Sequence, residues 1–399
     1  MRIGMMADVY KPHVSGITHY ISLNKKFLEQ AGHEVFIFTF GDLDYPDDET
    51  NVIRSPGLSL VDTGYSLNFR YSRKAKALLL TMDLVHVHHP FLSGRLALRY
   101  CRPLHIPVVF TNHTRYDLYA QAYMPLLPEE ISDSFLQSYM PPFCTAVDLV
   151  ISPSPGMADV LRKLGVTSQI EVVPNGVELD RYQQTCEGDC RAELGFTVED
   201  ILLVYSGRLG PEKNIDFLLR AFAGAAEAVD LVHLLLIGGG PEEESLKKLS
   251  FQLGVSDRVH FLGMVEYDRM PRLLAMCDLF VTASVTEVHP LSVIEAMASG
   301  LPALGIHSVG VGDTIEDGRT GMLATENQAA FAAKMTRLCL DSSLRRKMGN
   351  AARKASEKYA IERITQLIID HYENLAFAAQ PRRHSLRSRL RTFMEKLRE

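Results

Sequence analysis

The chain has 399 residues, of which 46% are hydrophobic and 23% charged, and its formal net charge is −6. These proportions are those of folded globular proteins, so they exclude an intrinsically disordered or fibrous chain. The negative charge is unlike the basic surface of nucleic-acid-binding domains and excludes that class of partner. Because single hydrophobic cores stop growing at about 250–300 residues, the length predicts two domains.

The sequence offers neither a membrane-spanning segment nor a metal-binding cysteine pattern. No apolar run approaches the roughly 18–20 residues that span a bilayer, and the chain begins directly with a strand rather than a signal peptide. The six scattered cysteines lack the second Cys or His pair of a zinc site, so we expect all six to be reduced. A cytoplasmic protein is expected.

Apolar and β-branched runs of strand length alternate with segments of helix length. The predicted strands are Ile3–Ala7, Val35–Phe40, Leu84–His88, Val108–Thr111, Leu149–Ser152, Leu202–Ser206, Val232–Ile237, Val259–Leu262 and Leu279–Ala283. This rhythm is typical of βαβ units with buried parallel strands, and it predicts an α/β, doubly wound fold. Such sheets bind their ligands beyond the carboxyl ends of the strands.

Two series of these units meet at Val172–Val177, where an apolar run ends in a Pro-Asn-Gly turn. We therefore predict two Rossmann-like domains, residues 1–173 and 174–360, facing each other across a cleft. A helix over 361–379 is expected to pack back on the N-terminal domain. Residues 380–399 are expected to form a separate basic amphipathic tail.

Hydrophobic periodicity predicts three consecutive helices near the end of the chain, at Asn327–Leu340, Ser343–Tyr359 and Ile361–Leu375. The last of these has Leu367 among the apolar residues expected near one face.

Two glutamates stand out in the segment Thr286–Pro302, which follows a predicted strand. Glu287 falls on the loop after the strand, and Glu295 falls in the first turn of the next helix, so both are expected to face the cleft. The structural alternatives are a solvated loop carboxylate for Glu287 and a capping box with Ser292 for Glu295.

Two cations occupy one predicted strand-to-helix loop, Ser206–Asn214. Arg208 and Lys213 are five residues apart and can converge on a pyrophosphate, where they would neutralise charge that builds on a leaving group. Ordinary surface cations are the alternative.

These two segments resemble the retaining GT-B glycosyltransferases of family 4, in which a Glu, seven residues and a second Glu run into Ala-Met-Ala and Gly-x-Pro. The resemblance covers about residues 1–375. It implies that Glu287 binds hydroxyls of the donor sugar, that Glu295 holds the nucleotide ribose, and that Arg208 and Lys213 bind the diphosphate. It also implies retaining, metal-independent hexosyl transfer without a cofactor, with the nucleotide-sugar as a substrate.

Further donor contacts are expected around the same nucleotide. Gly16 opens a helix after the first strand, and a glycine at a helix N-terminus lets backbone N–H groups approach a phosphate, although the family has two glycines where this chain has Ser15 and Gly16. The resemblance adds Gly238, Arg258, Val259, Leu291 and Ser292.

The chain departs from the family directly after the first glutamate. The family presents small residues whose N–H groups contact sugar and phosphate, whereas this chain has Val288, His289 and Pro290, and proline has no N–H to donate. The identity of the donor sugar therefore stays open.

The segment Thr111–Asp117 matches the family's histidine-containing loop on the acceptor side. His113 is expected to orient the acceptor or to contact the reacting centre, with Tyr116 and Tyr119 as acceptor residues. A histidine packed in the core is the alternative.

Two further patterns look like metal sites and are not predicted to be. In His86–His89, strand alternation sends His86 and His88 to one face and His89 to the other. Asp42–Asp44 lies in an acidic loop, and a GT-B architecture requires no metal.

Several features favour a lipid acceptor and an anionic membrane surface. Aromatic residues gather between Tyr116 and Phe143, and residues 380–399 carry Leu386, Leu390, Phe393 and Leu397 among basic residues, which is typical of interfacial helices. The alternatives are ordinary packing for the aromatic residues and a coiled coil or a solvated appendix for the tail. The loop at His113 also resembles the diacylglycerol glucosyltransferase branch of the family.

The function expected from the resemblance is transfer of glucose from a UDP-sugar to a membrane lipid such as diacylglycerol, forming an α-glycoside, by a cytoplasmic protein bound peripherally to the inner face of the cell membrane. A GDP-mannose donor, a soluble acceptor and an inactive nucleotide-sugar-binding membrane protein remain open. An NAD-dependent dehydrogenase is disfavoured because the first strand does not run into Gly-x-Gly-x-x-Gly.

Overall fold

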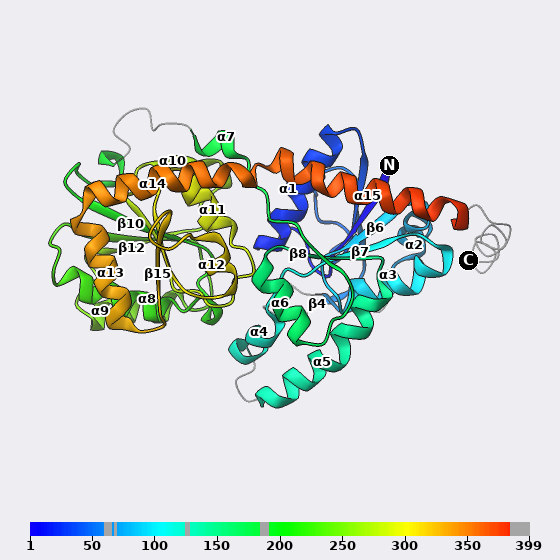
Figure 1. Ribbon diagram of the computed structural model, residues 1–399, viewed down its shortest axis with the longest axis horizontal. Helices are drawn as coiled ribbons and strands as arrows, with labels where there is room; N and C mark the ends of the chain where they lie inside the picture. The colour runs from blue at the N-terminus through cyan, green and yellow to red at the C-terminus, as the bar shows by residue number, and fades with distance from the viewer. Residues whose placement is uncertain (60–65, 68–69, 124–127, 184–190, 384–399) are drawn as a thin grey trace. The chain divides into compact units, whose positions relative to one another are not determined.

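The computed structural model describes the chain except residues 60–65, 68–69, 124–127, 184–190 and 384–399, so most of the predicted tail lies outside the described residues. The chain divides into two compact units, each built on its own sheet (Figure 1). Unit 1 comprises Met1–His113, Glu130–Pro174 and Glu362–Glu399, and unit 2 comprises Thr114–Glu129 and Asn175–Ile361.

Unit 1 contains a seven-stranded parallel sheet in the order β3-β2-β1-β6-β7-β8-β9. Its strands are β1 (Arg2–Met6), β2 (Glu34–Phe40), β3 (Val52–Ser55), β6 (Leu84–Val87), β7 (Val108–Thr111), β8 (Leu149–Ser152) and β9 (Ile170–Val172), beside a two-stranded pair, β4 (Leu58–Ser59) and β5 (Ser66–Leu67). The helices are α1 (Gly16–Gln30), α2 (Arg73–Leu79), α3 (Leu92–Tyr100), η1 (Arg102–Leu104), α5 (Glu129–Ala146), α6 (Pro155–Lys163) and α15 (Ile361–Arg383).

Unit 2 contains a six-stranded parallel sheet in the order β12-β11-β10-β13-β14-β15. The strands are β10 (Ile201–Ser206), β11 (Val232–Ile237), β12 (Val259–Gly263), β13 (Leu279–Thr282), β14 (Ala303–Ile306) and β15 (Gly321–Ala324). The helices are α4 (Tyr116–Tyr123), α7 (Leu179–Tyr182), η2 (Ala192–Leu194), η3 (Pro211–Lys213), α8 (Ile215–Ala226), α9 (Glu243–Gln252), η4 (Tyr267–Arg269), α10 (Met270–Ala275), α11 (Leu291–Ala298), α12 (Val309–Thr314), α13 (Gln328–Leu340), α14 (Ser342–Ser356) and η5 (Glu357–Tyr359).

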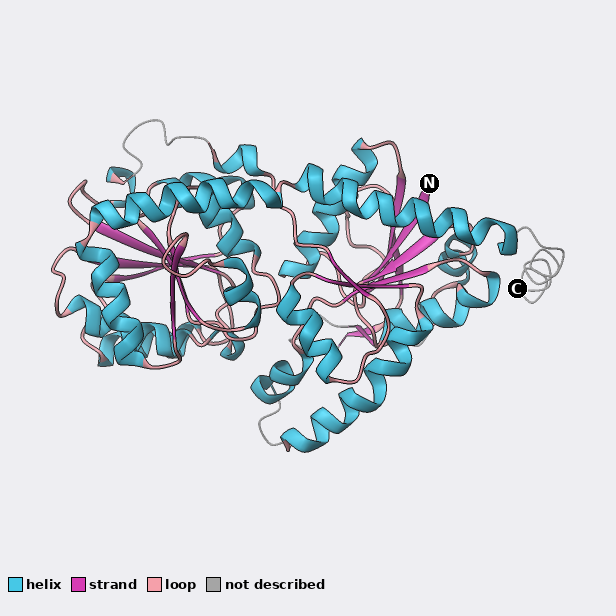
Figure 2. Cartoon of the chain, viewed as in Figure 1, coloured by secondary structure: helices cyan, strands magenta, loops and turns pink. Residues whose placement is uncertain are grey.

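Helices cover both faces of the sheet within each unit, which explains the continuous apolar strands (Figure 2). In β10, Leu203 packs into one hydrophobic cluster, while its neighbours Leu202 and Val204 pack into the cluster on the opposite face. A strand buried on both sides needs apolar residues on both faces, and residues 201–204 of β10 meet that need. The α/β doubly wound class predicted from the sequence is confirmed.

The C-terminal helix α15 contributes to the core of unit 1, beside α1 and β1 (Figure 1). Ile364, Ile368 and Tyr372 are buried in this core, at helical spacings of four residues. Leu367, which is predicted to lie near the same face, is 40% exposed.

Two further observations concern the chain as a whole. The four cysteines among the described residues are buried. Within the same residues, every helix is too short or too polar to cross a membrane.

Candidate functional site

Three strand-to-helix loops meet at one edge of the sheet of unit 2. Strand β10 lies between β11 and β13, and Ser206 at its end pairs with Ile237 at the end of β11. Because the strands are parallel, the loops that follow them emerge at the same edge. The loops after β10, β11 and β13 carry Arg208 with Lys213, Gly238, and Glu287, respectively.

Lys213 and Glu287 form an ion pair across two of these loops. The Nζ atom of Lys213 lies 2.6 Å from Oε1 of Glu287, and their side chains are only 15% and 21% exposed. Burial opposes the charge on both groups, but their mutual attraction prevails: it holds the pKa of Glu287 below its usual value and raises the pKa of Lys213 well above it. Lys213 and Glu287 are therefore both charged, and they lie beyond the carboxyl ends of the strands, where sheets of this kind bind their ligands.

The neighbouring carboxylate, Glu212, was not anticipated from the sequence. It is 3% exposed, and its Oε2 accepts a 2.7 Å hydrogen bond from the hydroxyl of Tyr123 at the end of α4. The guanidinium of Arg208 lies 5.7 Å from the centre of the same Tyr123 ring. A glutamate between two cations resembles a solvated loop residue in sequence, and only the packing of α4 on this loop buries it.

The same helix brings a predicted acceptor residue to this loop. Burial raises the pKa of Tyr119, and the charges of Lys213 and Glu287 act on the same hydroxyl. Of the predicted acceptor residues, Tyr116 and Tyr119 belong to unit 2, and His113 belongs to unit 1.

Glu295 occupies a buried position on α11. It is 6% exposed, and its Oε1 accepts a 3.2 Å hydrogen bond from Tyr267, a residue that sequence reasoning did not single out. Burial raises the pKa of Glu295 to about 6. The helix begins at Leu291 with Pro290 as N-cap and without a capping side chain, so the capping-box alternative with Ser292 is wrong.

The three residues that depart from the family pattern shape the start of α11. Val288 is buried, and Pro290 precedes the first helical turn. His289 accepts a hydrogen bond from the N–H of Asn175 through Nδ1, and its carbonyl accepts another from the Asn175 side chain. His289 therefore supports the loop from behind and ties it to the first residue of this part of unit 2.

Gly238 permits a very close approach between two of the loops. Its φ is +132°, and a Cβ atom built on it would lie 2.0 Å from the carbonyl oxygen of Gly207. Any side chain at this position would displace Gly207 and, with it, the adjacent Arg208.

We expect Gly238→Ala to destabilise the protein by more than the roughly 1–3 kcal/mol of backbone strain alone and to lower transfer by displacing Arg208. Gly254→Ala is the matched control, because Gly254 also has a positive φ, +70°, but nothing lies within 4 Å of its Cβ position. Urea unfolding and initial rates of both variants measure the difference. Equal effects in the two would contradict the role of the close approach.

Two predicted donor residues, Arg258 and Val259, lie where the strands of this sheet begin, opposite the loops that follow the carboxyl ends. Val259 begins β12, and the guanidinium of Arg258 donates to the carbonyls of Ala226 and Val229 after α8, at 2.9 and 3.1 Å. Arg258 and Val259 lie at the amino end of β12, whereas Lys213 and Glu287 follow the carboxyl ends of β10 and β13. The structure therefore does not bring Arg258 and Val259 together with Lys213. We leave both out of the proposed donor site.

In unit 1, the predicted phosphate loop ends at the start of α1. The Ser15 hydroxyl caps the helix by accepting from the N–H of Thr18, at 3.2 Å, and α1 begins at Gly16. Nothing lies within 4 Å of a Cβ atom built on Gly16. The helix N-terminus is thus open to an approaching anion, and Ser15 supplies the cap where the family has a glycine.

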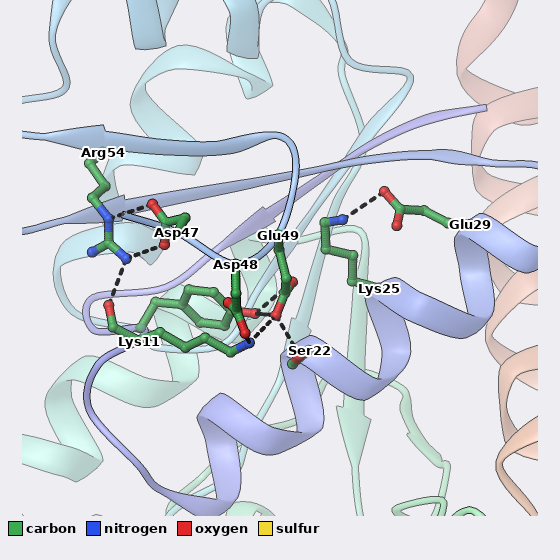
Figure 3. Close-up of polar contacts among 9 residues, drawn as sticks. Lys11, Ser22, Lys25, Glu29, Asp47, Asp48, Glu49 and Arg54 are labelled. Carbon is green, nitrogen blue, oxygen red and sulfur yellow. Dashed lines mark hydrogen bonds and ion pairs between the residues drawn. The ribbon is translucent and has the colours of Figure 1, made fainter. Parts of the chain in front are cut away.

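A charged network holds this loop in place (Figure 3). Lys11 lies 2.9 Å from Asp48 and also pairs with Glu49, while Glu49 accepts from Tyr10 at 2.9 Å and from Ser22 of α1 at 2.6 Å. The carboxylates of Asp48 and Glu49 thus pair with the ammonium group of Lys11. Among the described residues, no group of three His, Cys, Asp or Glu side chains could hold a metal ion.

His113 follows β7 and contacts the histidine that follows β6. Its Nε2 lies 3.1 Å from Nδ1 of His88, which is fully buried, and the ring of Tyr20 packs 4.6 Å from the ring of His113. His86 lies on the same side as His88, with ring centres 4.3 Å apart, whereas His89 accepts from the N–H of Asp8. The predicted placement of His86 and His88 on one side is confirmed.

Comparison with known proteins places both halves of the chain. Residues 14–181 match the family described as Glycosyltransferase Family 4, and residues 188–355 match Glycosyl transferases group 1. The chain is 32% identical to the alpha-monoglucosyldiacylglycerol synthase of Streptococcus pneumoniae over 333 residues, which cover 81% of this chain and 75% of that relative.

Solved structures show the same fold. Sucrose-phosphate synthase from Thermosynechococcus elongatus has a TM-score of 0.78 at 21% identity, covering 95% of this chain and 99% of that chain. HepE from Anabaena, in complex with UDP-glucose, has a TM-score of 0.74 at 20% identity, covering 94% and 100%. The two sheets and this likeness identify the fold as GT-B.

Proposed function

The chain belongs to glycosyltransferase family 4, whose members are retaining, metal-independent GT-B enzymes, and we propose that it transfers glucose from UDP-glucose to a diacylglycerol-type lipid. The observation that carries this proposal is the Lys213–Glu287 pair after neighbouring strands of unit 2. The lipid acceptor and glucose are favoured by the relative's name, and UDP by the HepE complex.

In the proposed reaction, Lys213 and Arg208 bind the donor diphosphate, Glu287 accepts hydrogen bonds from sugar hydroxyls, and Glu295 binds the ribose. The bond between sugar C1 and the diphosphate oxygen breaks, and the acceptor hydroxyl oxygen bonds to C1 on the same face. The acceptor proton passes to the departing phosphate oxygen, so the products are UDP and an α-glucoside. The two cations stabilise the charge that develops on the leaving group.

A surface of unit 1 suits a membrane interface. On α5, Ile131 and Phe135 are 56% and 53% exposed, and Phe135 stacks on Tyr139, with ring centres 5.7 Å apart. Beside them, a hollow of about 200 Å³ is lined by Phe91, Leu92, Arg95, Leu96 and Arg99. Exposed apolar and aromatic side chains next to arginines favour peripheral binding to anionic lipid.

The proposal is tested by incubating the full chain with radiolabelled UDP- and GDP-sugars and liposomes that contain diacylglycerol, in the presence of EDTA. Chloroform-extractable label from UDP-glucose supports it. Label from GDP-mannose, label only in water-soluble products, or donor binding without transfer would replace it with a mannosyltransferase, a soluble acceptor or an inactive binding protein, respectively.

We expect the double variant Ile131→Ser/Phe135→Ser to lower transfer to liposomes about tenfold or more, because each buried apolar side chain contributes roughly 1.5–3 kcal/mol. UDP affinity should be unchanged, since α5 carries no donor residue. Phe251→Ser on α9, which removes a side chain that is 77% exposed in unit 2, is the matched control. Equal liposome sedimentation of the double variant and the control would argue against this membrane surface.

A further inference from the structure

The environment of His113 decides which of its nitrogens carries a proton. His88 and His113 follow adjacent parallel strands, β6 and β7, in which Val87 pairs with Phe110, so their rings meet beyond the ends of the strands. Nδ1 of His88 and Nε2 of His113 are 3.1 Å apart. Tyr20 packs against both rings, with its ring centre 5.7 Å from that of His88 and 4.6 Å from that of His113.

Both imidazoles are neutral. Burial lowers the pKa of His88 and of His113 well below the usual value, and neighbouring histidines lower both further. One proton therefore lies between the two facing nitrogens, and two arrangements are possible. Either His113 donates from Nε2 or His88 donates from Nδ1.

The far side of His88 distinguishes the two arrangements. Its Nε2 is buried and has no hydrogen-bond partner among the described residues. If His113 donated, neutral His88 would carry its own proton on this Nε2, as a buried N–H without an acceptor. A buried N–H group without an acceptor is rare in proteins. The arrangement in which His88 donates leaves only a bare nitrogen there.

We propose that His88 is a positioning residue that locks His113 in the tautomer with its proton on Nδ1, so that His113 offers a substrate oxygen an N–H donor. This inference rests on the proposed function for its substrate, but the tautomer itself does not. The Nδ1–H group of His113 can donate a hydrogen bond to a hydroxyl or phosphate oxygen of a substrate. Because this nitrogen already carries a proton, it cannot remove the proton of the hydroxyl that attacks the sugar. That proton must therefore pass to the departing diphosphate.

The direct test is ¹⁵N NMR of the full chain labelled at histidine nitrogens, near neutral pH. The chain has 14 histidines, so the signals of His113 are assigned by their loss in His113→Gln. A proton on Nδ1 and a bare Nε2 support the inference. A proton on Nε2, or a doubly protonated ring, overturns it. This readout needs no activity, so a chain that transfers nothing would defeat the proposed function and leave the tautomer decided.

Variants of His88 test the consequence for transfer. His88→Asn keeps an N–H donor near the position of Nδ1 and should retain the tautomer and most of kcat. His88→Phe removes the donor and should lower kcat up to about tenfold, the value of one hydrogen bond, with little change in KM for the donor sugar. His105→Asn, an exposed position in the same unit, is the control. Equal losses in the Asn and Phe variants, with the tautomer of His113 unchanged in both, would overturn the role of His88.

Discussion

Lys213→Met is expected to reduce glycosyl transfer about 10²–10³-fold, because it removes a cation that we propose stabilises the charge developing on the leaving diphosphate. It should also destabilise the fold. Glu287 would lose the partner that lies 2.6 Å away, in a site where both side chains are mostly shielded from water. Removing one member of a fully buried pair costs about 3–5 kcal/mol, which sets the upper limit here.

A double-mutant cycle separates the two effects. Glu287→Gln alone should likewise lose both stability and transfer, whereas Lys213→Met/Glu287→Gln removes both charges and should recover most of the stability while transfer stays lost. Urea unfolding and initial rates measure the two quantities on the same four proteins.

The control for the cycle is an exposed pair. Lys247 lies 2.8 Å from Glu243 on the surface of α9, and Lys247→Met should change neither unfolding nor rate. Transfer at the wild-type rate by the folded double variant would remove Lys213 and Glu287 from the active site.

The strands predicted from the sequence are those whose residues are apolar at nearly every position, such as Val232–Ile237 in β11. Packing on both faces demands that composition, and few other structures do. Strands β3, β14 and β15 of the two parallel sheets were missed, and so was the two-stranded pair β4 and β5. The first three have only four residues each, and Gly321–Ala324 carries no β-branched residue. Their pairing is set by neighbouring strands rather than by local preference.

The residues that we propose for the donor site on the loops after β10 and β13 could be named from the sequence, since each follows an apolar run and a turn. Their proximity depends on β10 and β13 being neighbours in the sheet, although β11 and β12 lie between them in the chain. The contacts of Tyr123 with Glu212 and of Tyr267 with Glu295 join segments 89 and 28 residues apart and have no local pattern. The sequence likewise did not show that Arg258 lies at the amino end of its strand, away from the loops that carry Lys213 and Glu287.

The burial of Glu295, which we propose binds the nucleotide ribose, lowers the stability of the fold when the carboxyl is ionised. Its folded pKa, about 6, lies above the ordinary value of 4.5, so the folded state binds more protons than the unfolded state between these values. The contribution of Glu295 to stability is therefore most favourable below pH 4.5 and falls as the pH rises through 6. Above that range the ionised, buried carboxylate costs about 2 kcal/mol, the free-energy equivalent of a pKa raised from 4.5 to about 6.

Glu295→Gln is accordingly expected to raise the free energy of unfolding by about 2 kcal/mol at pH 8 and to leave it nearly unchanged at pH 4.5. The amide carries no charge to bury and can still accept the hydrogen bond from Tyr267. UDP affinity should nevertheless fall by roughly tenfold to a hundredfold, because a hydrogen bond to a charged group contributes about 1.5–3 kcal/mol and the ribose would lose it. Urea unfolding at the two pH values and calorimetric titration with UDP measure these changes, with Glu244→Gln, whose side chain is 79% exposed, as the control. A gain in stability that is equal at both pH values would contradict the cost of burying an ionised Glu295. Unchanged UDP affinity would remove Glu295 from the nucleotide site. A gain in stability together with a loss of UDP affinity would mean that this buried carboxylate serves ligand binding at the expense of stability.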